Sequence, residues 1–279
     1  MSEEIINPYP ASSFDFEARP LSYSSLKHIL TSPLHFADNW HHGKSRKKTD
    51  DLFFGSLVDD LLFFPDEFNK KYTVKPKFEG TGARTREKEW KDENKSMQFA
   101  TNEQIREAKI MAENIKTNPI TKWLYEATTA IQQTMIYTDK KTGLKFICKM
   151  DSVAEFKGRT IIWDLKTAAD ASNEQYQKDA SKWGYPLQGH MYCNAYIRKS
   201  GKFPEFYNIV AEKGDPYAVN NFRADATFMQ VGKKQFEIAV ERILYCMEHD
   251  CFNQGYEFMN IQGYNILSVP YYEKTKWLD

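Results

Sequence analysis

Hydrophobic residues recur along the chain with two different periods, which predict separate groups of helices and strands. A spacing of three or four positions indicates helices with one apolar face, whereas runs of β-branched and aromatic residues between turn residues indicate strands. One helix opens at Ser22, and the other predicted helices cover residues 33–40, 51–64, 102–116, 172–199 (with an interruption at 184–186) and 224–249. The predicted strands cover residues 129–138, 144–156, 160–167, 203–211 and 217–222.

The order of these elements is helices, three strands, a helix, two strands and a final helix. This order predicts an α/β protein in which a sheet lies between helices. Residues 41–50 form a basic segment that we interpret either as a solvated loop or as a loop that contacts phosphates. Residues 73–97 are polar and are expected to be irregular, either as a DNA-binding loop or as a mobile surface loop.

The most informative segment is the predicted hairpin of residues 148–167, whose strands flank a short turn that contains Gly158. Side chains alternate between the faces of a strand, so Asp164 and Lys166 point to one side. Asp151 on the partner strand can reach the same patch. Two carboxylates provide the hard oxygen ligands that Mg²⁺ or Mn²⁺ prefers, and a lysine can orient water or stabilise a phosphate oxyanion. The combination is suited to phosphodiester hydrolysis.

An isolated Asp-x-Lys pair has a simpler interpretation as a surface ion pair of little consequence. The second strand of the hairpin argues against that interpretation, because it is apolar on both faces and therefore resembles a buried central strand. Buried charges require a partner or a metal. The almost wholly apolar helix of residues 51–64 poses the same problem, since it carries Asp59 and Asp60, one of which should face inward.

Composition narrows the class of protein. The 279 residues include 38 basic and 38 acidic side chains, so the net charge of zero argues against simple coating of nucleic acid. No apolar run is long enough for a membrane span, and no secretory signal is visible, so we expect a cytoplasmic protein. The four cysteines lack C-x-x-C pairs, which argues against a zinc site and favours buried free thiols. Their spacing alone leaves an iron–sulfur cluster open.

Taken together, the motifs resemble the PD-(D/E)xK nuclease superfamily, and within it the RecE (exonuclease VIII) type of phage recombination nuclease. The resemblance spans nearly the whole chain. Its strongest part is the ordered series Asp151, then Trp163-Asp-Leu-Lys-Thr167, then Gln188-Gly-His-Met-Tyr192. Weaker parts are the N-terminal segment 24–36, the Gly55-Ser-Leu-Val-Asp59 helix, the loop of residues 72–90 and the C-terminal run from residue 251. The resemblance implies a restriction-endonuclease-like fold, with a mixed central sheet flanked by helices.

The resemblance also implies roles for individual residues. The catalytic residues would be Lys166, Gln188 and Tyr192. The metal ligands for Mg²⁺ or Mn²⁺ would be Asp151, Asp164, the Leu165 carbonyl and Asp59. Separately, basic residues near the site could follow a DNA backbone while Trp183 stacks on an end base, although ordinary solvated surface is the alternative for each of them. The DNA-binding candidates are Lys44, Arg46, Lys47, Arg84, Arg86 and Lys182.

The implied protein is a single nuclease domain over residues 1–279. Residues 1–128 would form a helical part with basic loops, 129–223 the catalytic sheet and 224–279 the C-terminal helix and tail. The resemblance implies an Mg²⁺-dependent exonuclease that resects linear double-stranded DNA from 5′ ends for recombination. It also implies a homo-oligomer that hands the remaining strand to a single-strand annealing protein.

Two departures from the family pattern keep other functions open. Asp59 stands where the family has His, and Gln132 is aligned with a family Glu. A neutral amide holds a cation less well than a carboxylate does. The alternatives are a non-catalytic nuclease-like module that binds DNA or a partner, and a structure-specific endonuclease.

Overall fold

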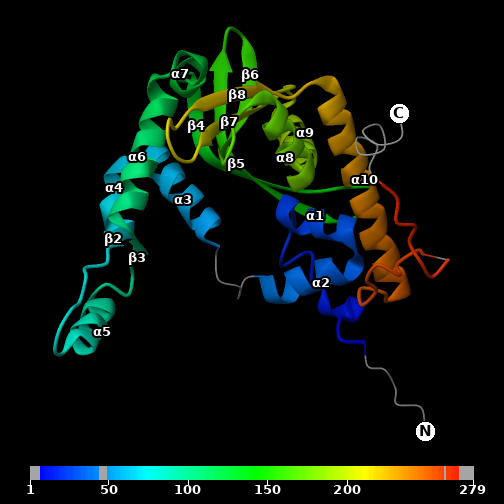
Figure 1. Cartoon of the computed structure of the whole chain (residues 1–279). Helices are drawn as coiled ribbons and strands as arrows, with labels where there is room; N and C mark the ends of the chain where they lie inside the picture. The colour runs from blue at the N-terminus through cyan, green and yellow to red at the C-terminus, as the bar shows by residue number, and fades with distance from the viewer. Residues whose placement is uncertain (1–6, 44–48, 261, 270–279) are drawn as a thin grey trace.

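A mixed six-stranded sheet runs through the centre of the molecule, with helices on both faces (Figure 1). The computed structural model describes residues 7–43, 49–260 and 262–269. The sheet has the order β1-β5-β6-β7-β8. The strands β1 and β6 pair with different stretches of one edge of β5, and β4 pairs along the opposite edge. Its strands are β1 (Leu21–Ser22), β4 (Thr128–Thr138), β5 (Lys145–Phe156), β6 (Arg159–Ala168), β7 (Glu205–Glu212) and β8 (Val219–Arg223). The predicted α/β class with a mixed, helix-flanked sheet is confirmed.

The predicted hairpin is the centre of this sheet. β5 and β6 are antiparallel, with Ser152 opposite Trp163 and Phe156 opposite Arg159. Lys157 and Gly158 both have positive φ, 50° and 75°, as a tight two-residue hairpin turn requires. β6 then pairs in parallel with β7, and a helical crossover makes this connection.

One face of the sheet packs against four helices. Leu26, Ile29 and Phe36 from the first two helices share a core with Ile162 of β6 and Met191. All five side chains are fully buried. The helices on this face are α1 (Tyr23–Thr31), α2 (Pro33–His42), α9 (Tyr185–Ser200) and α10 (Ala226–His249). A short 3-10 turn, η1 (Ala11–Ser13), precedes them, and Phe14 after it packs into the same core.

The opposite face is covered by a second helical layer. Trp163 of β6 is fully buried there, in a core that it shares with Leu57, Met111 and Ile115. Because Ile162 and Trp163 enter opposite cores, β6 is the central strand with two buried faces that its sequence predicts. The helices of this layer are α3 (Asp50–Phe63), α4 (Pro65–Lys71), α6 (Asn102–Thr117) and α7 (Pro119–Glu126).

The predicted helix of residues 172–199 is two helices, α8 (Asn173–Trp183) and α9, which meet at Gly184 in the left-handed conformation. Two other glycines fix the position of α9. A Cβ on Gly189 would lie 2.7 Å from the Phe206 ring of β7, and a Cβ on Gly232 of α10 would lie 1.9 Å from the carbonyl oxygen of Pro186. The backbone of α9 therefore approaches both the sheet and α10 at positions that lack a side chain.

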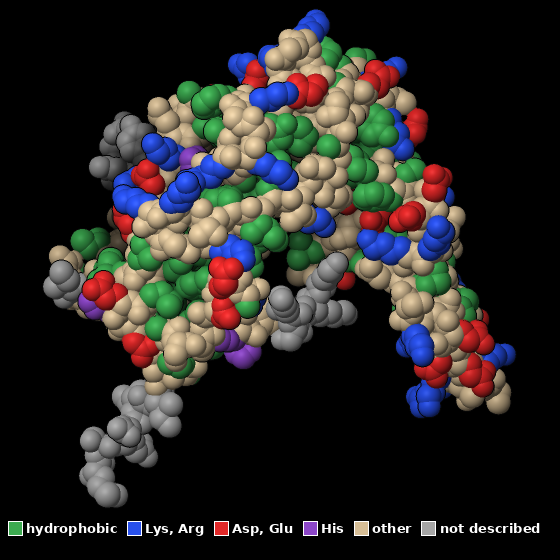
Figure 2. All heavy atoms as spheres, turned by 180° about the vertical axis from the view of Figure 1, so that it is seen from behind, with side chains coloured by type: hydrophobic (Ala, Val, Ile, Leu, Met, Phe, Trp, Pro, Cys, Tyr) green, Lys and Arg blue, Asp and Glu red, His purple; other side chains and the backbone are tan. Residues whose placement is uncertain are grey.

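Residues 73–97 differ from the expected irregular loop. They belong to a projecting arm, which we define as β2 (Tyr72–Val74), α5 (Ala83–Glu93) and β3 (Gln98–Ala100), with β2 and β3 paired in parallel. The ring of Trp90 on α5 packs against Phe99 at an interplanar angle of 45°, with ring centroids 4.8 Å apart. Figure 2 shows the arm as a separate projection that carries both acidic and basic side chains, with a hollow between it and the body.

Two composition-based expectations can be compared with the described residues. All four cysteines are free and buried, as predicted. None of the helices in the described part of the chain combines the length and apolar character needed to cross a membrane.

Candidate active site

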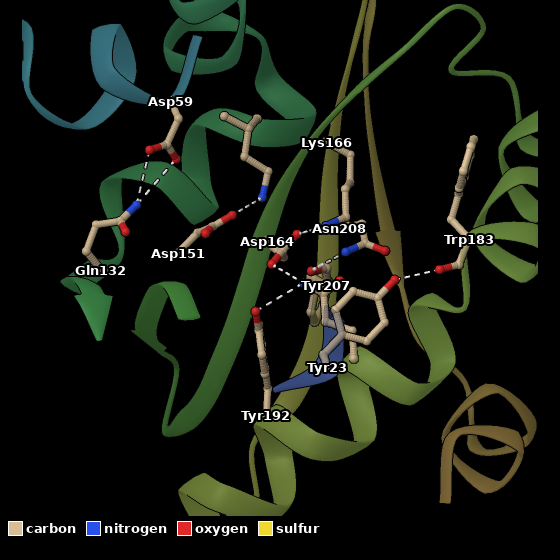
Figure 3. Close-up of polar contacts among 12 residues, drawn as sticks. Tyr23, Asp59, Gln132, Asp151, Asp164, Lys166, Trp183, Tyr192, Tyr207 and Asn208 are labelled. Carbon is tan, nitrogen blue, oxygen red and sulfur yellow. Dashed lines mark hydrogen bonds and ion pairs between the residues drawn. The ribbon is translucent and has the colours of Figure 1, made fainter. Parts of the chain in front are cut away.

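Asp164 and Lys166 lie side by side on β6, as their spacing in a strand predicts. Asp164 is only 2% exposed, and its carboxylate pairs with the Lys166 ammonium. Leu165 between them turns to the opposite face and packs against the other core. Figure 3 shows the pair at the centre of the polar cluster. A carboxylate this deeply buried needs such a partner, so the ion pair explains how β6 accommodates its charge.

Asp151 reaches the same place from β5. Its carboxylate accepts a hydrogen bond of 3.0 Å from the backbone amide of Leu165. Burial and the neighbouring charges of Asp164 and Asp59 raise the pKa of Asp151 well above its ordinary value, although Lys166 and the Leu165 amide oppose this rise. The two carboxylates therefore repel each other across the hairpin, and one cation does not neutralise both.

Lys166 is a cation in this environment. Burial by itself would lower its pKa, but Asp164, Tyr185 and Asp151 outweigh burial and raise the pKa of Lys166 above its ordinary value. The ammonium also lies 4.4 Å from the centre of the Tyr185 ring, at the start of α9. A protonated lysine can stabilise negative charge on a phosphate or hold a water through that water's oxygen, but it cannot accept a proton.

Helix α9 completes the centre of the site. Its Gln188 side chain donates hydrogen bonds to Asp164 (2.8 Å) and to the Tyr192 hydroxyl (3.2 Å). Burial, followed by Asp164 and Asp151, raises the pKa of Tyr192 well above its ordinary value, so the phenol is neutral. The Gln188 carbonyl oxygen is buried and has no hydrogen-bond partner among the described residues. The Gln188 side chain therefore keeps one unused acceptor in the buried part of the site.

Asp59 approaches from α3, on the other side of the hairpin. Gln132 donates a hydrogen bond of 3.1 Å to its carboxylate (Figure 3). Gln132 lies within β4 with φ of 49°, a left-handed conformation that a non-glycine residue adopts only when its surroundings enforce it. Burial and the charges of Asp60 and Asp164 raise the pKa of Asp59 to about 6, against opposing effects of Lys149 and Lys71. The two departures from the family pattern are thus hydrogen-bonded to each other.

Asp60, next to Asp59, has a different role. It is 8% exposed and accepts hydrogen bonds from Tyr72 (2.6 Å) and Lys71. These contacts join α3 to the base of the arm. Asp59 and Asp60 therefore both have polar partners, and Asp59 is the one that faces the hairpin.

A cavity of about 740 Å³ opens beside Asp59. Its lining includes Asp59 and Gln132 together with Lys70, Lys71 and Lys149, whereas Asp164 and Lys166 do not line it. The cavity therefore lies next to the central cluster, on the α3 side, and brings three lysines close to the acidic residues.

The predicted DNA-binding residues are dispersed. Arg84 and Arg86 lie on α5 of the arm, and the Arg86 guanidinium donates to the Glu79 backbone carbonyl. Lys182 lies on α8, with its ammonium 5.2 Å from the Trp183 ring centre, and Trp183 is 50% exposed. Three further candidates, Lys44, Arg46 and Lys47, lie outside the described residues.

Sequence reasoning missed the part of the site that α1 supplies. Tyr23 donates a hydrogen bond of 2.5 Å to the Trp183 carbonyl oxygen, and burial raises the pKa of its phenol above the ordinary range, with Lys166, Tyr185 and Asp164 as neighbouring charges. Burial and the charge of Lys166 lower the pKa of Lys27, one turn later on the same helix. The i, i+4 spacing of Tyr23 and Lys27 beside the apolar face of α1 is the sequence signal that could have identified them.

The side chains of this site suit a divalent metal, although they do not form a closed cluster. Within residues 7–43, 49–260 and 262–269, no three His, Cys, Asp or Glu side chains converge closely enough to hold an ion. Asp151 and Asp164 nevertheless share only the charge of Lys166, and the Gln188 carbonyl oxygen has no partner in the described chain. A hydrated Mg²⁺ or Mn²⁺, with Asp151, Asp164, Asp59 and the Leu165 carbonyl as candidate ligands, would offset the excess negative charge.

Comparisons with known proteins identify the family. A solved structure of a presumed exonuclease from Eubacterium rectale is 15% identical and has a TM-score of 0.59, with 99% of this chain and 98% of that chain covered. A phage-related exonuclease from Haemophilus somnus 129PT is 15% identical with a TM-score of 0.36, over 83% of this chain and 96% of that chain. No curated protein matches.

The first structural likeness shows a shared fold over the whole chain. Residues 22–256 match the model of a family described as "PDDEXK-like domain of unknown function (DUF3799)". This match begins at Ser22, the last residue of β1, and continues past the end of α10, so it includes β4 to β8 and every element that contributes to the acidic cluster. The chain therefore belongs to this PDDEXK-like family, within the PD-(D/E)xK nuclease superfamily.

Proposed function

We propose that the protein is a metal-dependent deoxyribonuclease that resects linear double-stranded DNA from 5′ ends, as a single nuclease domain of the RecE type. The observation that carries this proposal is the contact set around Asp164, which pairs with Lys166 and accepts a hydrogen bond from Gln188. Asp151 and Asp59 add negative charge beside it. This arrangement gathers from two strands and two helices the carboxylates and the cation that metal-assisted phosphodiester hydrolysis uses.

The protein's own residues would bind and orient the substrate. The protonated Lys166 is suited to contact a non-bridging phosphate oxygen or the attacking water. Gln188 holds the Asp164 carboxylate in a fixed orientation, and the neutral Tyr192 supports Gln188 from one turn away. A bound Mg²⁺ or Mn²⁺ would lower the pKa of a water molecule and offset charge on the phosphate.

The test is digestion of linear duplex DNA, labelled at either the 5′ or the 3′ end, with Mg²⁺ or Mn²⁺. Metal-dependent release of 5′ label with closed circular DNA left intact is the expected result. Lys166→Ala should abolish it. Lys122→Ala is the matched control, because the exposed Lys122 forms an ion pair with Glu126 on α7, a helix that carries none of the DNA-binding candidates. Cleavage of the circle would instead indicate an endonuclease, and release from 3′ ends would contradict the proposed polarity.

A non-catalytic DNA-binding module is the second candidate. Two observations favour it. Lys166 already neutralises the charge of Asp164, and the Asp59 carboxylate already accepts a hydrogen bond from Gln132. Duplex binding without cleavage, in the presence of either metal, would establish this alternative. Restoring the family pattern with Asp59→His and Gln132→Glu would then be expected to introduce cleavage.

The proposed partners follow from the proposed activity. Double-stranded DNA ends would be the substrate, and a single-strand annealing protein would receive the exposed strand. We also propose a homo-oligomer, and light scattering of the purified protein tests this directly.

A further inference from the structure

One turn of α9 contacts both members of the Asp164–Lys166 ion pair. Gln188 donates a hydrogen bond to the Asp164 carboxylate. Tyr185, three residues earlier, lies beside the lysine, and the Lys166 ammonium is 4.4 Å from the centre of the Tyr185 ring. Residues three positions apart in a helix share a face, so this turn places a hydrogen-bond donor against the acid and an aromatic ring against the cation.

The Tyr185 ring is held in place by its neighbours. Next to it lies the buried ring of Tyr176 on α8, with centroids 6.3 Å apart, and Tyr176 packs in turn on Phe222 of β8 at 4.6 Å. From α1, Tyr23 donates a hydrogen bond to the carbonyl oxygen of Trp183, two residues before Tyr185 (Figure 3). Contacts from α1, α8 and β8 therefore limit how far this half-buried ring can move relative to the lysine.

The ring limits the positions that the Lys166 ammonium can adopt. A lysine ends in three N–H donors on a flexible stem of four carbons. Among the described residues, Asp164 is the one hydrogen-bond partner of this ammonium. The electron-rich face of Tyr185 attracts the same cation, and this attraction is stronger where water has little access, as at the Lys166 side chain, which is 15% exposed. Two contacts from different elements therefore fix the ammonium and leave at least one N–H free for a substrate.

We propose that Tyr185 is a positioning residue for Lys166, and that its ring face holds the ammonium where a free N–H reaches the scissile phosphate or the attacking water. This inference rests on the proposed function and adds a residue to its mechanism. Tyr185 acts through Lys166 and not on the DNA, so removal of the ring should lower kcat and leave KM almost unchanged. The phenolic hydroxyl has no part in this role, because the ring face alone attracts the cation.

The experiment changes the electron density of the Tyr185 ring while its size stays nearly constant. Tyr185→Leu removes the ring, and Tyr185→Phe restores it without the hydroxyl. Phenylalanines with one, two or three ring fluorines, incorporated at the same position, then withdraw electron density from the ring face in steps and weaken its attraction for a cation. Tyr125→Leu is the matched control, because Tyr125 also lies near a lysine, with its ring centre 6.0 Å from the Lys116 ammonium, in the opposite helical layer.

Two quantities are measured on the full chain, namely kcat and KM for linear duplex DNA with Mg²⁺, and the equilibrium constant of urea unfolding in EDTA. Tyr185→Leu should lower kcat about tenfold, with KM within about twofold, as expected for a cation–π contact shielded from water. Tyr185→Phe should recover most of this loss, each added fluorine should lower kcat again, and Tyr125→Leu should leave kcat unchanged. The unfolding constant should rise along the same fluorine series. This trend should disappear in the background Asp164→Asn, Lys166→Met, which has no cation beside the ring.

A kcat that does not depend on the number of fluorines, in a protein that cuts DNA, would overturn the positioning role and leave the proposed nuclease intact. An unfolding constant without a fluorine trend, or with a trend that persists without Lys166, would also overturn it, because the ring would then contribute packing and not attraction for the cation. A wild-type protein that never cuts, with an unfolding trend that requires Lys166, refutes the nuclease alone, since the contact between ring and ammonium is established without cleavage.

Discussion

The side-chain amide of Gln188 lies 2.8 Å from the Asp164 carboxylate and connects α9 to the central strand of the sheet. The same amide nitrogen lies 3.2 Å from the Tyr192 hydroxyl, which does not itself reach Asp164. The two residues share a helix face, but they differ in their distance from the acidic cluster. Gln188 contacts the cluster directly, and Tyr192 contacts only Gln188. The first prediction uses this difference.

Replacing Gln188 by Leu should lower kcat/KM by about 10- to 100-fold, because a hydrogen bond to a charged group contributes roughly 1.5 to 3 kcal/mol. Tyr192→Phe removes only the outer hydroxyl and should lower kcat/KM by less than about fivefold, since a neutral hydrogen bond contributes about 1 kcal/mol. Steady-state digestion of linear duplex DNA measures both. Equal losses in the two variants would contradict the ranking.

The Asp164–Lys166 pair predicts a pattern of stability. Lys166→Met leaves a buried carboxylate without its cation and should lower the free energy of unfolding by about 3 kcal/mol. The double variant Asp164→Asn, Lys166→Met removes both charges and should recover most of that loss without recovering activity. Urea denaturation in EDTA measures the three free energies. If the double variant is as unstable as the single one, packing and not charge explains the loss.

Asp59 predicts a dependence of stability on pH. Its pKa is about 6 in the folded protein against an ordinary value of 3.8, so between these values the folded state holds a proton that the unfolded state has released. Stability therefore falls as pH rises through this window, by on the order of 3 kcal/mol. Asp59→Asn keeps an acceptor for Gln132 but cannot ionise.

The Asp59→Asn variant should match the wild type below pH 4 and exceed its melting temperature above pH 6, in EDTA. Asp92→Asn on the exposed arm is the control, and it should leave the melting temperature unchanged both below pH 4 and above pH 6. A wild-type advantage at pH 7 would mean that the ionised Asp59 carboxylate stabilises the fold.

Gln132 predicts how the site responds to one more negative charge. Gln132→Glu replaces a donor to Asp59 with a second carboxylate, so the two groups should repel each other and lower metal-free stability by about 1 to 2 kcal/mol. Mg²⁺ should reverse this loss, because an ion bound only by the folded state stabilises it by mass action. Melting curves across an Mg²⁺ titration measure the effect. A variant that stays destabilised at saturating Mg²⁺ would argue against a metal beside Asp59.

The elements that bear the central chemistry were predictable because their sequence pattern is local and strong. The β5–β6 hairpin has alternating side chains and a glycine turn, and both strands lie within two residues of their predicted bounds. The break between α8 and α9 was visible because Gly184 must adopt a left-handed conformation there. In such segments the fold and the placement of Asp164 beside Lys166 follow from the same spacing.

Other parts lacked a local signal. Helix α5 has no apolar stripe, since it packs chiefly through Trp90 on Phe99 and Phe78, and so residues 73–97 were wrongly expected to be irregular. The Gln132–Asp59 hydrogen bond depends on a left-handed residue within a strand, which no pattern of polarity indicates. The i, i+4 spacing of Tyr23 and Lys27 marks a shared helix face, but only the packing of α1 on α9 brings that face to the site, and the local sequence does not indicate this packing.

The absence of a side chain at Gly232 affects the geometry of the active site. It lets α10 touch the Pro186 carbonyl, two residues before Gln188. An added methyl group there would lie 1.9 Å from the Pro186 carbonyl oxygen, so α9 and α10 would have to separate, and we expect Gln188 to lose its contact with Asp164. The spacing between α9 and α10 thus controls the position of Gln188. A substitution far from the acidic cluster can therefore abolish activity while every reactive group remains intact.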